Sequence, residues 1–195
     1  MLLFFQQLLR NEFSDTAEST KTCSHFYLSA VHNDTVYPIR ISDVPPVPAF
    51  PMNNLTEWTH FRCYGLRHAT AYILVYDISS IESFQFLKIL RDQIYDSRNM
   101  TETPVVVVAN KIDLLENCDS EVRDRRDVKL LVKKHWKCGY VECSAKYNWK
   151  IGKILKELIK ILQYNQSGGQ DSKSKCYISS SDTYLNSKEK KCIIL

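Results

Sequence analysis

A mostly parallel α/β sheet is the fold class that the sequence predicts, and three observations predict it. Apolar residues run without interruption at 71–76 and 104–108, which is typical of strands buried on both faces. Helical patterns follow these runs, so strand and helix alternate three times from residue 71 onward. The chain has 195 residues, of which 44% are hydrophobic and 25% charged, a composition that supports one packed domain and a tail.

The first strands are expected to form a hairpin. Residues 24–31 and 36–42 predict strands, and the turn-forming sequence His-Asn-Asp-Thr lies between them. Four prolines in the stretch 44–51 predict a loop, because proline has no backbone N–H to give to a helix or a sheet. A short helical segment is expected around residues 58–66.

Units of strand and helix follow this loop. The first helix is predicted to begin at Ser79, with Glu82 completing a capping box that satisfies backbone N–H groups of the first turn. Four apolar residues then recur at helical spacing: Phe84, Leu87, Leu90 and Ile94. The later elements are predicted as helix 123–135, strand 139–143 and helix 148–164.

The chain divides into a domain at residues 1–164 and a tail at residues 165–195. Ser, Gly, Lys and Asn dominate most of the tail, which predicts a flexible linker without a core of its own. The chain ends in the sequence CIIL, a C-a-a-X signal with Cys192 as its lipid acceptor. Leucine at the last position favours geranylgeranyl over farnesyl.

A single prenyl chain usually needs a second attraction to hold a protein on a membrane. Lysines near the lipid acceptor supply one on an anionic leaflet: Lys188, Lys190 and Lys191. We therefore expect the protein at the cytoplasmic face of the plasma membrane or of an endomembrane, or in the cytosol if Cys192 is not prenylated.

Charge and cysteine content exclude several other functions. The net charge of +4 is mildly basic and argues against nucleic acid as a partner. The five histidines are scattered without metal-ligand spacing, and the seven cysteines include no Cys-x-x-Cys pair. The start of the chain lacks the basic region of a secretory signal peptide. Reduced thiols in a cytosolic protein are therefore expected.

The sharpest chemical signal is the motif Asn-Lys-Ile-Asp that directly follows the strand at 104–108. In an open α/β sheet, ligands bind at the carboxyl ends of the strands. The carboxylate of Asp113 can accept two adjacent hydrogen bonds, which guanine offers at N1–H and N2–H₂ and adenine does not. The stem of Lys111 can lie along the base, and Asn110 can tie the loop to neighbouring backbone. The alternative is a polar turn between strand and helix.

A second polar loop, with Ser144, Ala145 and Lys146, follows the strand at 139–143. The small side chain of Ala145 lets its backbone N–H approach a carbonyl oxygen such as guanine O6. Because the two loops lie at neighbouring strand ends, they are predicted to form one pocket for the base. The alternative is a pair of unrelated turns.

The chain resembles the Ras-like small GTPases. The motifs NKID and SAK, the junction VYDISSIESF and the terminal CIIL carry this similarity. The junction DVPP and the run CGYVECSAKYNW resemble the branch called Ras-like family member ten more than Ras itself. The resemblance covers the stretch from Asn11 to Leu162. It implies a mostly parallel six-stranded sheet with helices on both faces, which binds GTP and GDP with Mg²⁺.

Three further residues receive roles from the resemblance alone. Phe13 matches the position where the family packs an aromatic ring against the base. Thr20 matches the threonine of the first switch, which is a ligand of Mg²⁺ in the GTP state. Asp43 matches the aspartate that opens the second switch and holds Mg²⁺ through water. The alternative for Asp43 is a solvated carboxylate at a strand end.

Two features depart from the family. Residues 1–10 match the helix after the glycine-rich phosphate loop, and no glycine precedes Gly65, so the first strand and that loop are missing from the sequence. We expect a sheet that lacks its central first strand, with unpaired backbone groups beside the gap unless the chain rearranges. The sequence is interpreted as a truncated gene model or a short isoform.

The second switch is also altered. Pro46 stands where the family has a glycine whose N–H binds the γ-phosphate, and Val47 stands where a glutamine orients water. GTP hydrolysis is therefore expected to be slow or to depend on a partner, and no catalytic residue is assigned. The prediction is a membrane-anchored, guanine-nucleotide-binding signalling protein. The alternatives are a nucleotide-free, prenylated protein-binding module and a non-functional fragment.

Overall fold

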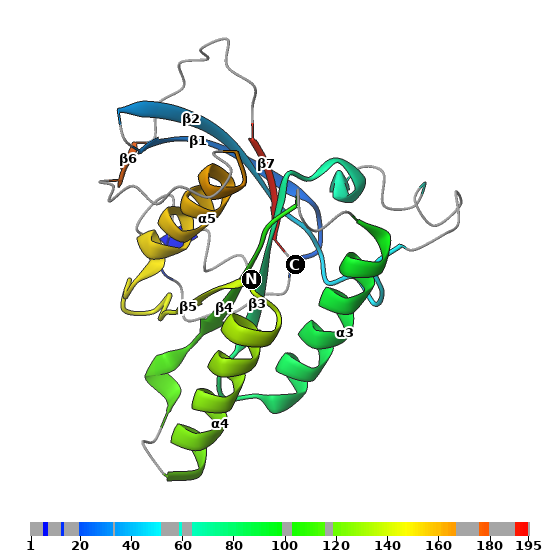
Figure 1. Ribbon diagram of the computed structural model, residues 1–195, viewed down its shortest axis with the longest axis vertical. Helices are drawn as coiled ribbons and strands as arrows, with labels where there is room; N and C mark the ends of the chain where they lie inside the picture. The colour runs from blue at the N-terminus through cyan, green and yellow to red at the C-terminus, as the bar shows by residue number, and fades with distance from the viewer. Residues whose placement is uncertain are drawn as a thin grey trace.

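The computed structural model shows a seven-stranded sheet with helices on both faces (Figure 1). It describes the following parts of the chain: residues 6–7, 13, 20–32, 34–51, 59, 64–98, 103–115, 119–166, 176–179 and 190–194. The strand order is β5-β4-β3-β7-β2-β1-β6. The helical segment expected around residues 58–66 and the residues 1–10, which match a helix of the family, lie largely outside the described residues.

The predicted hairpin is present as β1 (Ser24–His32) and β2 (Thr35–Asp43), paired antiparallel along their full length. Asp34 adopts a left-handed backbone with φ 57° in the turn, which a short polar side chain tolerates. Alternate side chains enter the core, including Leu28 and Ala30 from β1 and Ile39 and Ile41 from β2. The predicted strand boundaries are confirmed to within one residue at most ends.

The parallel part of the sheet consists of β3 (Ala71–Asp77), β4 (Val105–Asn110) and β5 (Gly139–Glu142). The four valines of β4 are buried on both sides of the strand, as a continuous apolar run predicts. All three strands run in the same direction, so their carboxyl ends lie along one edge of the sheet. The two predicted base loops follow the carboxyl ends of β4 and β5.

In the part of the chain that the structure describes, three helices cover the sheet. They are α3 (Ile81–Ser97), α4 (Asp119–Leu130) and α5 (Ile151–Gln166), with a π-helical continuation of α4 at Leu131–His135. Short 3₁₀ turns are η2 (Leu66–His68) and η3 (Ile112–Leu114). One core cluster joins α5 to one face of the sheet, and a second joins α3 and the end of α4 to the other face (Figure 1).

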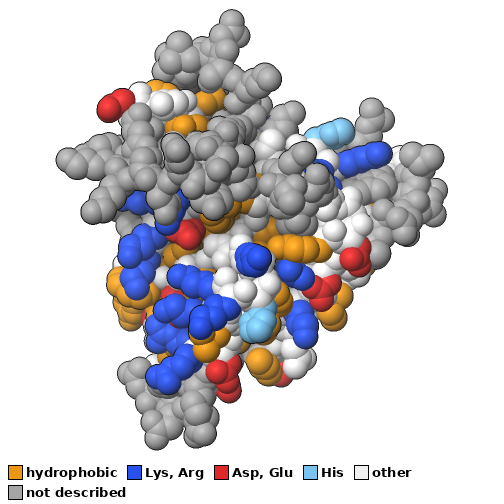
Figure 2. Space-filling model, viewed as in Figure 1, with side chains coloured by type: hydrophobic (Ala, Val, Ile, Leu, Met, Phe, Trp, Pro, Cys, Tyr) orange, Lys and Arg blue, Asp and Glu red, His pale blue; other side chains and the backbone are white. Residues whose placement is uncertain are grey.

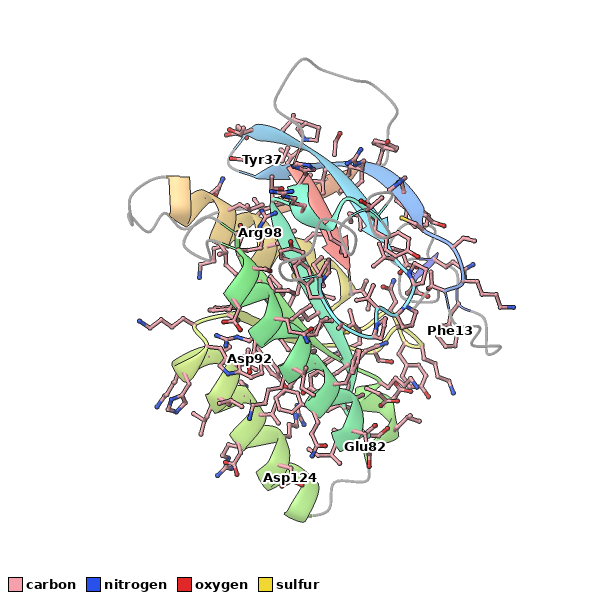
Figure 3. All side chains as sticks on the ribbon, turned by 90° about the vertical axis from the view of Figure 1, so that its right-hand side faces the viewer. Phe13, Tyr37, Glu82, Asp92, Arg98 and Asp124 are labelled. Atoms are coloured by element: carbon pink, nitrogen blue, oxygen red, sulfur yellow. The ribbon has the colours of Figure 1, made fainter. Side chains whose placement is uncertain are left out.

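The start of α3 differs by one residue from the capping prediction. The N-cap is Ser80, whose hydroxyl accepts a hydrogen bond from the Ser83 N–H at 3.2 Å and donates one to Glu82. Ser79 does not cap the helix because Asp77 accepts hydrogen bonds from both its N–H and its hydroxyl. Figure 3 shows Glu82 at this end of α3 and Arg98, the C-cap, at the other.

The centre of the sheet is completed by the end of the chain. Strand β7 (Lys190–Ile194) lies between β2 and β3 and runs parallel to both, as Figure 1 shows in red. The gap that we expected at this position is therefore filled, which is the rearrangement that the unpaired backbone groups require. Cys192 of β7 is fully buried.

The tail also differs from the expectation of a linker without regular structure. Two of its segments are strands, since β6 (Cys176–Ser179) pairs antiparallel with β1 and β7 enters the centre. The helix before the tail, α5, ends at Gln166, two residues beyond its predicted end. Within the described parts of the chain, no helix combines the length and apolar character needed to cross a membrane.

Candidate functional site

The first predicted loop begins where β4 ends. Asn110 is the last residue of β4, and Lys111 has a left-handed backbone with φ 67° that turns the chain sharply into η3. Asp113 lies within this 3₁₀ turn. The Ile112 N–H donates to the Cys143 carbonyl at 3.3 Å, which ties the loop to the end of β5.

Asn110 joins the two predicted loops. Its side-chain Oδ1 accepts a hydrogen bond from the Ala145 N–H at 3.1 Å and one from the Cys143 thiol at 3.6 Å. Both donors belong to the segment that follows β5. The structure therefore brings together the two motifs that the sequence places 31 to 35 residues apart.

Ser144 makes the second link between the loops. It is 1% exposed, and its hydroxyl donates to Asp113 Oδ1 while accepting from the Tyr147 N–H at 3.2 Å. Reciprocal backbone hydrogen bonds between Ser144 and Trp149 close the segment into a tight turn. One carboxylate oxygen of Asp113 is thereby fixed in position by a neutral hydroxyl.

Asp77 is a member of this edge that the sequence analysis did not single out. Its Oδ2 lies 2.7 Å from Lys111 Nζ, and its Oδ1 accepts from Ser79. Burial acts to raise the pKa of Asp77, but the hydrogen bonds from Lys111 and Ser79 outweigh it and lower the pKa. Its position as the last residue of β3 was the available signal.

An ion pair between Glu142 and Arg125 anchors the end of β5, directly before the second loop. Arg125 on α4 binds both carboxylate oxygens of Glu142, the last residue of β5, in a two-pronged ion pair. Burial opposes ionisation of Glu142, yet the hydrogen bonds and charge of Arg125 lower its pKa. The sequence showed a charged helix here but gave no sign that Arg125 reaches β5.

Two further predicted base contacts, Phe13 and Lys146, have exposed side chains. Phe13 is 37% exposed, and its neighbours along the chain lie outside the described residues. Figure 3 shows the Phe13 side chain at the margin of the molecule. Lys146 is exposed, with its Nζ 5.7 Å from the centre of the Tyr147 ring.

The predicted metal ligands meet at the end of β2. The Thr20 hydroxyl donates to Asp43 Oδ2 at 3.1 Å, and both residues are buried. The alternative of a solvated carboxylate at Asp43 is wrong, because this residue is 0% exposed. Burial raises the pKa of Asp43, against the smaller lowering effect of the Thr20 hydrogen bond.

The pair has the chemistry of a site for a hard cation. Among the residues that the structure describes, Asp43 Oδ1 is a buried oxygen without a hydrogen-bond partner, and a hydroxyl and a carboxylate are ligands that Mg²⁺ prefers. A divalent cation would supply the partner that this oxygen lacks. Among the described residues, no group of three His, Cys, Asp or Glu side chains offers another metal site.

The proline-rich loop after Asp43 is attached to the core rather than exposed as a whole. Val44, Val47 and Phe50 are at most 2% exposed and pack in the cluster with α3. The Phe50 N–H also donates to Gln93 Oε1 at 2.7 Å. Pro46 is exposed. The buried side chain of Val47 therefore points into the protein and not toward solvent.

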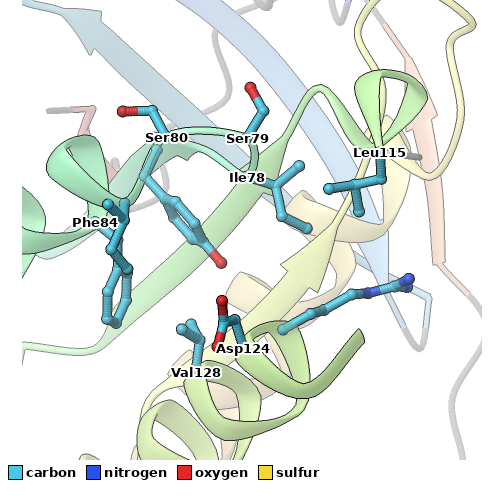
Figure 4. A pocket seen from close by; sticks show the side chains of 10 residues that line it. Ile78, Ser79, Ser80, Phe84, Leu115, Asp124 and Val128 are labelled. Atoms are coloured by element: carbon cyan, nitrogen blue, oxygen red, sulfur yellow. The ribbon is translucent and has the colours of Figure 1, made fainter. Parts of the chain in front are cut away.

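A small pocket lies beside the start of α3, between that junction and α4 (Figure 4). Its volume is about 130 Å³, and its lining includes Ser79, Ser80 and Asp124. Pockets for ligands of nucleotide size generally enclose at least about 300 Å³. The lining of this pocket includes neither Asp113 nor Ala145, so the pocket is separate from the predicted base contacts.

Comparison with known proteins places the chain in a family. The Ras family model matches residues 3–164. Human Ras-like protein family member 10B is 48% identical over 158 residues, covering 80% of this chain and 76% of the relative. Mouse Ras-like protein family member 10A is 32% identical over the same shares. The GTP-binding protein Rheb homolog of Dictyostelium discoideum is 34% identical over about half of each chain. The chain belongs to the Ras family of small GTPases, and its sheet and helices form a G domain of that family.

Proposed function

We propose that the protein binds guanine nucleotide through the two loops at the ends of β4 and β5. The observation that carries the proposal is the link between these loops: Asn110 holds Ala145, and Ser144 holds Asp113. These hydrogen bonds fix a carboxylate beside a backbone N–H of a small residue. This arrangement complements the hydrogen-bonding edge of guanine.

Asp113 provides the selectivity. A carboxylate accepts from guanine N1–H and N2–H₂, whereas adenine presents an acceptor at N1 and leaves the carboxylate unpaired. The Ala145 N–H already donates to Asn110, so recognition of guanine O6 at this position requires the N–H to be shared between two acceptors. The ammonium of Lys111 is held at 2.7 Å from Asp77, which leaves the aliphatic stem of Lys111 as the part proposed to lie along the base.

Thr20 and Asp43 are the proposed residues for Mg²⁺. Their oxygens are 3.1 Å apart and buried, and one carboxylate oxygen has no hydrogen-bond partner. When bound, the ion would neutralise charge on the nucleotide phosphates. Thr20 and Asp43 would hold it at the carboxyl end of β2.

We propose that hydrolysis of GTP is slow or depends on a partner. Pro46 has no N–H to donate to a phosphate, and Val47 carries no polar group and is 2% exposed. Neither residue can orient a water molecule for attack. A second protein would have to supply that group.

We also propose that the protein is lipidated at Cys192 and carried to the cytoplasmic face of a membrane. The terminal CIIL sequence supports geranylgeranylation. Exposed cations on α4, its continuation and α5 would add attraction to anionic lipid, and Figure 2 shows part of this basic surface in blue. They include Lys129, Lys133, Lys134, Lys153 and Lys156.

Titration of the purified chain with fluorescent GDP, GTP and ATP tests nucleotide binding. We expect saturation with the guanine nucleotides and at least tenfold weaker binding of ATP, a difference of about 1.4 kcal/mol or more. Failure to saturate with GDP or GTP at roughly 100 μM would favour the nucleotide-free binding module. One observation favours this second candidate. Strand β7 completes the sheet between β2 and β3, so the sheet is continuous without a bound nucleotide.

A further inference from the structure

The groove between β2 and β3 holds β7, a strand that comes from the C-terminal end of the chain. All five residues of β7 are in register with Ile39–Asp43 of β2, and the last three are also in register with Ala71–Ile73 of β3. Both neighbours are parallel to β7. The groove therefore accepts an extended segment through backbone hydrogen bonds on two sides.

The inserted segment contains the proposed lipid acceptor. Cys192 lies opposite Ile41 on one side and Ala71 on the other, and it is 0% exposed. Its side chain belongs to the core cluster shared by the sheet and α5. A close-packed interior has no room for a prenyl chain at this position.

We propose that the groove between β2 and β3 is a binding site for the chain's own segment Lys190–Ile194, and that insertion of this strand and prenylation of Cys192 exclude each other. This inference rests on the proposed lipidation for its second half only. A prenyltransferase must bind the terminal residues as a released, extended peptide. In the inserted strand, the Cys192 thiol is buried and the backbone is paired with β2 and β3, so neither is accessible to such an enzyme.

The chemical step shows why release must come first. The Cys192 sulfur attacks the first carbon of geranylgeranyl diphosphate, forming a thioether bond. The carbon–oxygen bond breaks, the diphosphate leaves with the electron pair, and the thiol proton passes to solvent. Every one of these events needs Cys192 outside the sheet. After the reaction, the attached lipid prevents the strand from returning to its buried register.

Lys191→Pro tests the insertion without changing the terminal CIIL sequence. Proline cannot donate a backbone hydrogen bond and is excluded from the middle of a sheet, so it should release β7. Lys188→Pro, which precedes the strand, is the matched control. The full chain is treated with iodoacetamide in native buffer and in urea, and alkylation of each cysteine is measured by mass spectrometry.

We expect Cys192 of the parent chain to react at least tenfold more slowly in native buffer than in urea. Lys191→Pro should bring the native rate close to the urea rate, and Lys188→Pro should not. Cys143, which is also 0% exposed, reports on the rest of the fold and should stay protected in all three proteins. Equal native and urea rates for Cys192 in the parent would overturn the insertion.

If Lys191→Pro unfolds the whole domain, the proposal is tested on the parent chain alone by comparing the alkylation rates of Cys192 and Cys143. Each rate is expressed relative to the urea rate of the same cysteine. Cys192 should then be less protected than Cys143, because the strand leaves without global unfolding. Equal protection of the two cysteines would overturn a separable strand.

Incubation with geranylgeranyl diphosphate and a purified geranylgeranyltransferase tests the second half. Lys191→Pro should be prenylated at least tenfold faster than the parent and the Lys188→Pro control. Equal rates for all three would overturn mutual exclusion. If Lys191→Pro exposes Cys192 to iodoacetamide but accepts no lipid, then the proposed lipidation fails and the strand insertion stands.

Discussion

Two carboxylates at the same edge of the sheet have opposite surroundings. Glu142, at the end of β5, is bound by both prongs of Arg125, and its pKa is lowered. Asp43, at the end of β2, receives one hydrogen bond from Thr20, and burial raises its pKa. Glu142 is held by an arginine side chain, whereas the hydrogen-bond donor to Asp43 is the neutral hydroxyl of Thr20.

The difference shows at which part of this sheet edge the polar groups are already hydrogen-bonded within the protein. At the base loops, Asn110, Ser144 and Arg125 satisfy the polar groups internally, so the shape exists before a ligand arrives. At the metal pair, a buried oxygen of Asp43 remains without a partner. Burying an unpaired carboxylate oxygen is unfavourable, and the proposed cation would supply a partner for it.

The largest expected effect comes from Asp113→Asn, which removes the charge and replaces one of the two acceptor oxygens for guanine with an NH₂ donor. Two charge-assisted hydrogen bonds are lost, each contributing about 1.5–3 kcal/mol, so GDP affinity should fall by roughly 10² to 10⁴-fold. Titration with GDP and XDP measures the change, because the amide should prefer xanthine. Asp127→Asn, an exposed position on α4, is the control. An unchanged ratio of GDP to XDP affinity would contradict the base-loop assignment.

Arg125→Ala should remove the support under the second loop. It leaves Glu142 buried without a counter-charge, and because Arg125 is about one-third exposed we expect a loss of about 2–3 kcal/mol in unfolding free energy. Urea unfolding at neutral pH measures this loss. Arg126→Ala, next to it and exposed, should change little.

The pH dependence of the same variant gives a second test. Since the pKa of Glu142 is lowered in the folded chain, its stabilising effect is present above the unfolded value of about 4.3 and is lost as pH falls through the folded value. The parent should therefore lose more stability than Arg125→Ala between pH 6 and pH 3. Parallel losses in the two proteins would show that the pair contributes nothing.

Asp43→Asn should separate the metal pair from the base loops. In the parent, Mg²⁺ at ten times its dissociation constant should stabilise the bound state by about 1.4 kcal/mol, which slows GDP release about tenfold. The variant should release GDP at the same rate with Mg²⁺ or EDTA, since its amide cannot provide the charge. Asp96→Asn on α3 is the control. A Mg²⁺ effect that survives in Asp43→Asn would remove this residue from the metal site.

The smallest expected effect distinguishes two adjacent serines. Ser80→Ala removes the N-cap of α3 and should cost about 1 kcal/mol in unfolding free energy. Ser79→Ala leaves that cap intact and should cost less, because Ser79 only binds Asp77 at an exposed position. Thermal unfolding of the two variants compares them directly. A larger loss in Ser79→Ala would return the cap to its predicted position.

The features predicted well from sequence are those set by nearby residues. Buried strands, amphipathic helices and the two loops at strand ends follow from local pattern, so Asn110 and Ala145 could be placed on one edge before their contact was known. The pairing of Thr20 with Asp43 came from the family resemblance, since no local pattern joins residues 23 positions apart.

The features missed are those that depend on distant partners. Strand β7 pairs with residues about 150 positions earlier, and its short lysine-rich sequence carries no alternating pattern. The ion pair between Arg125 and Glu142 joins a helix to a strand. The local sequence pattern of either segment therefore does not predict it. Ser80 replaced Ser79 as the cap because Asp77 competes for the earlier hydroxyl.

The loop of residues 44–51 has a mechanical consequence. Three apolar side chains and one backbone hydrogen bond fasten it to the body of the protein. Freeing one anchor while the others hold would leave a void or an unpaired polar group, so the attachments should let go together. We therefore expect this loop to detach from the core as one unit rather than to bend gradually.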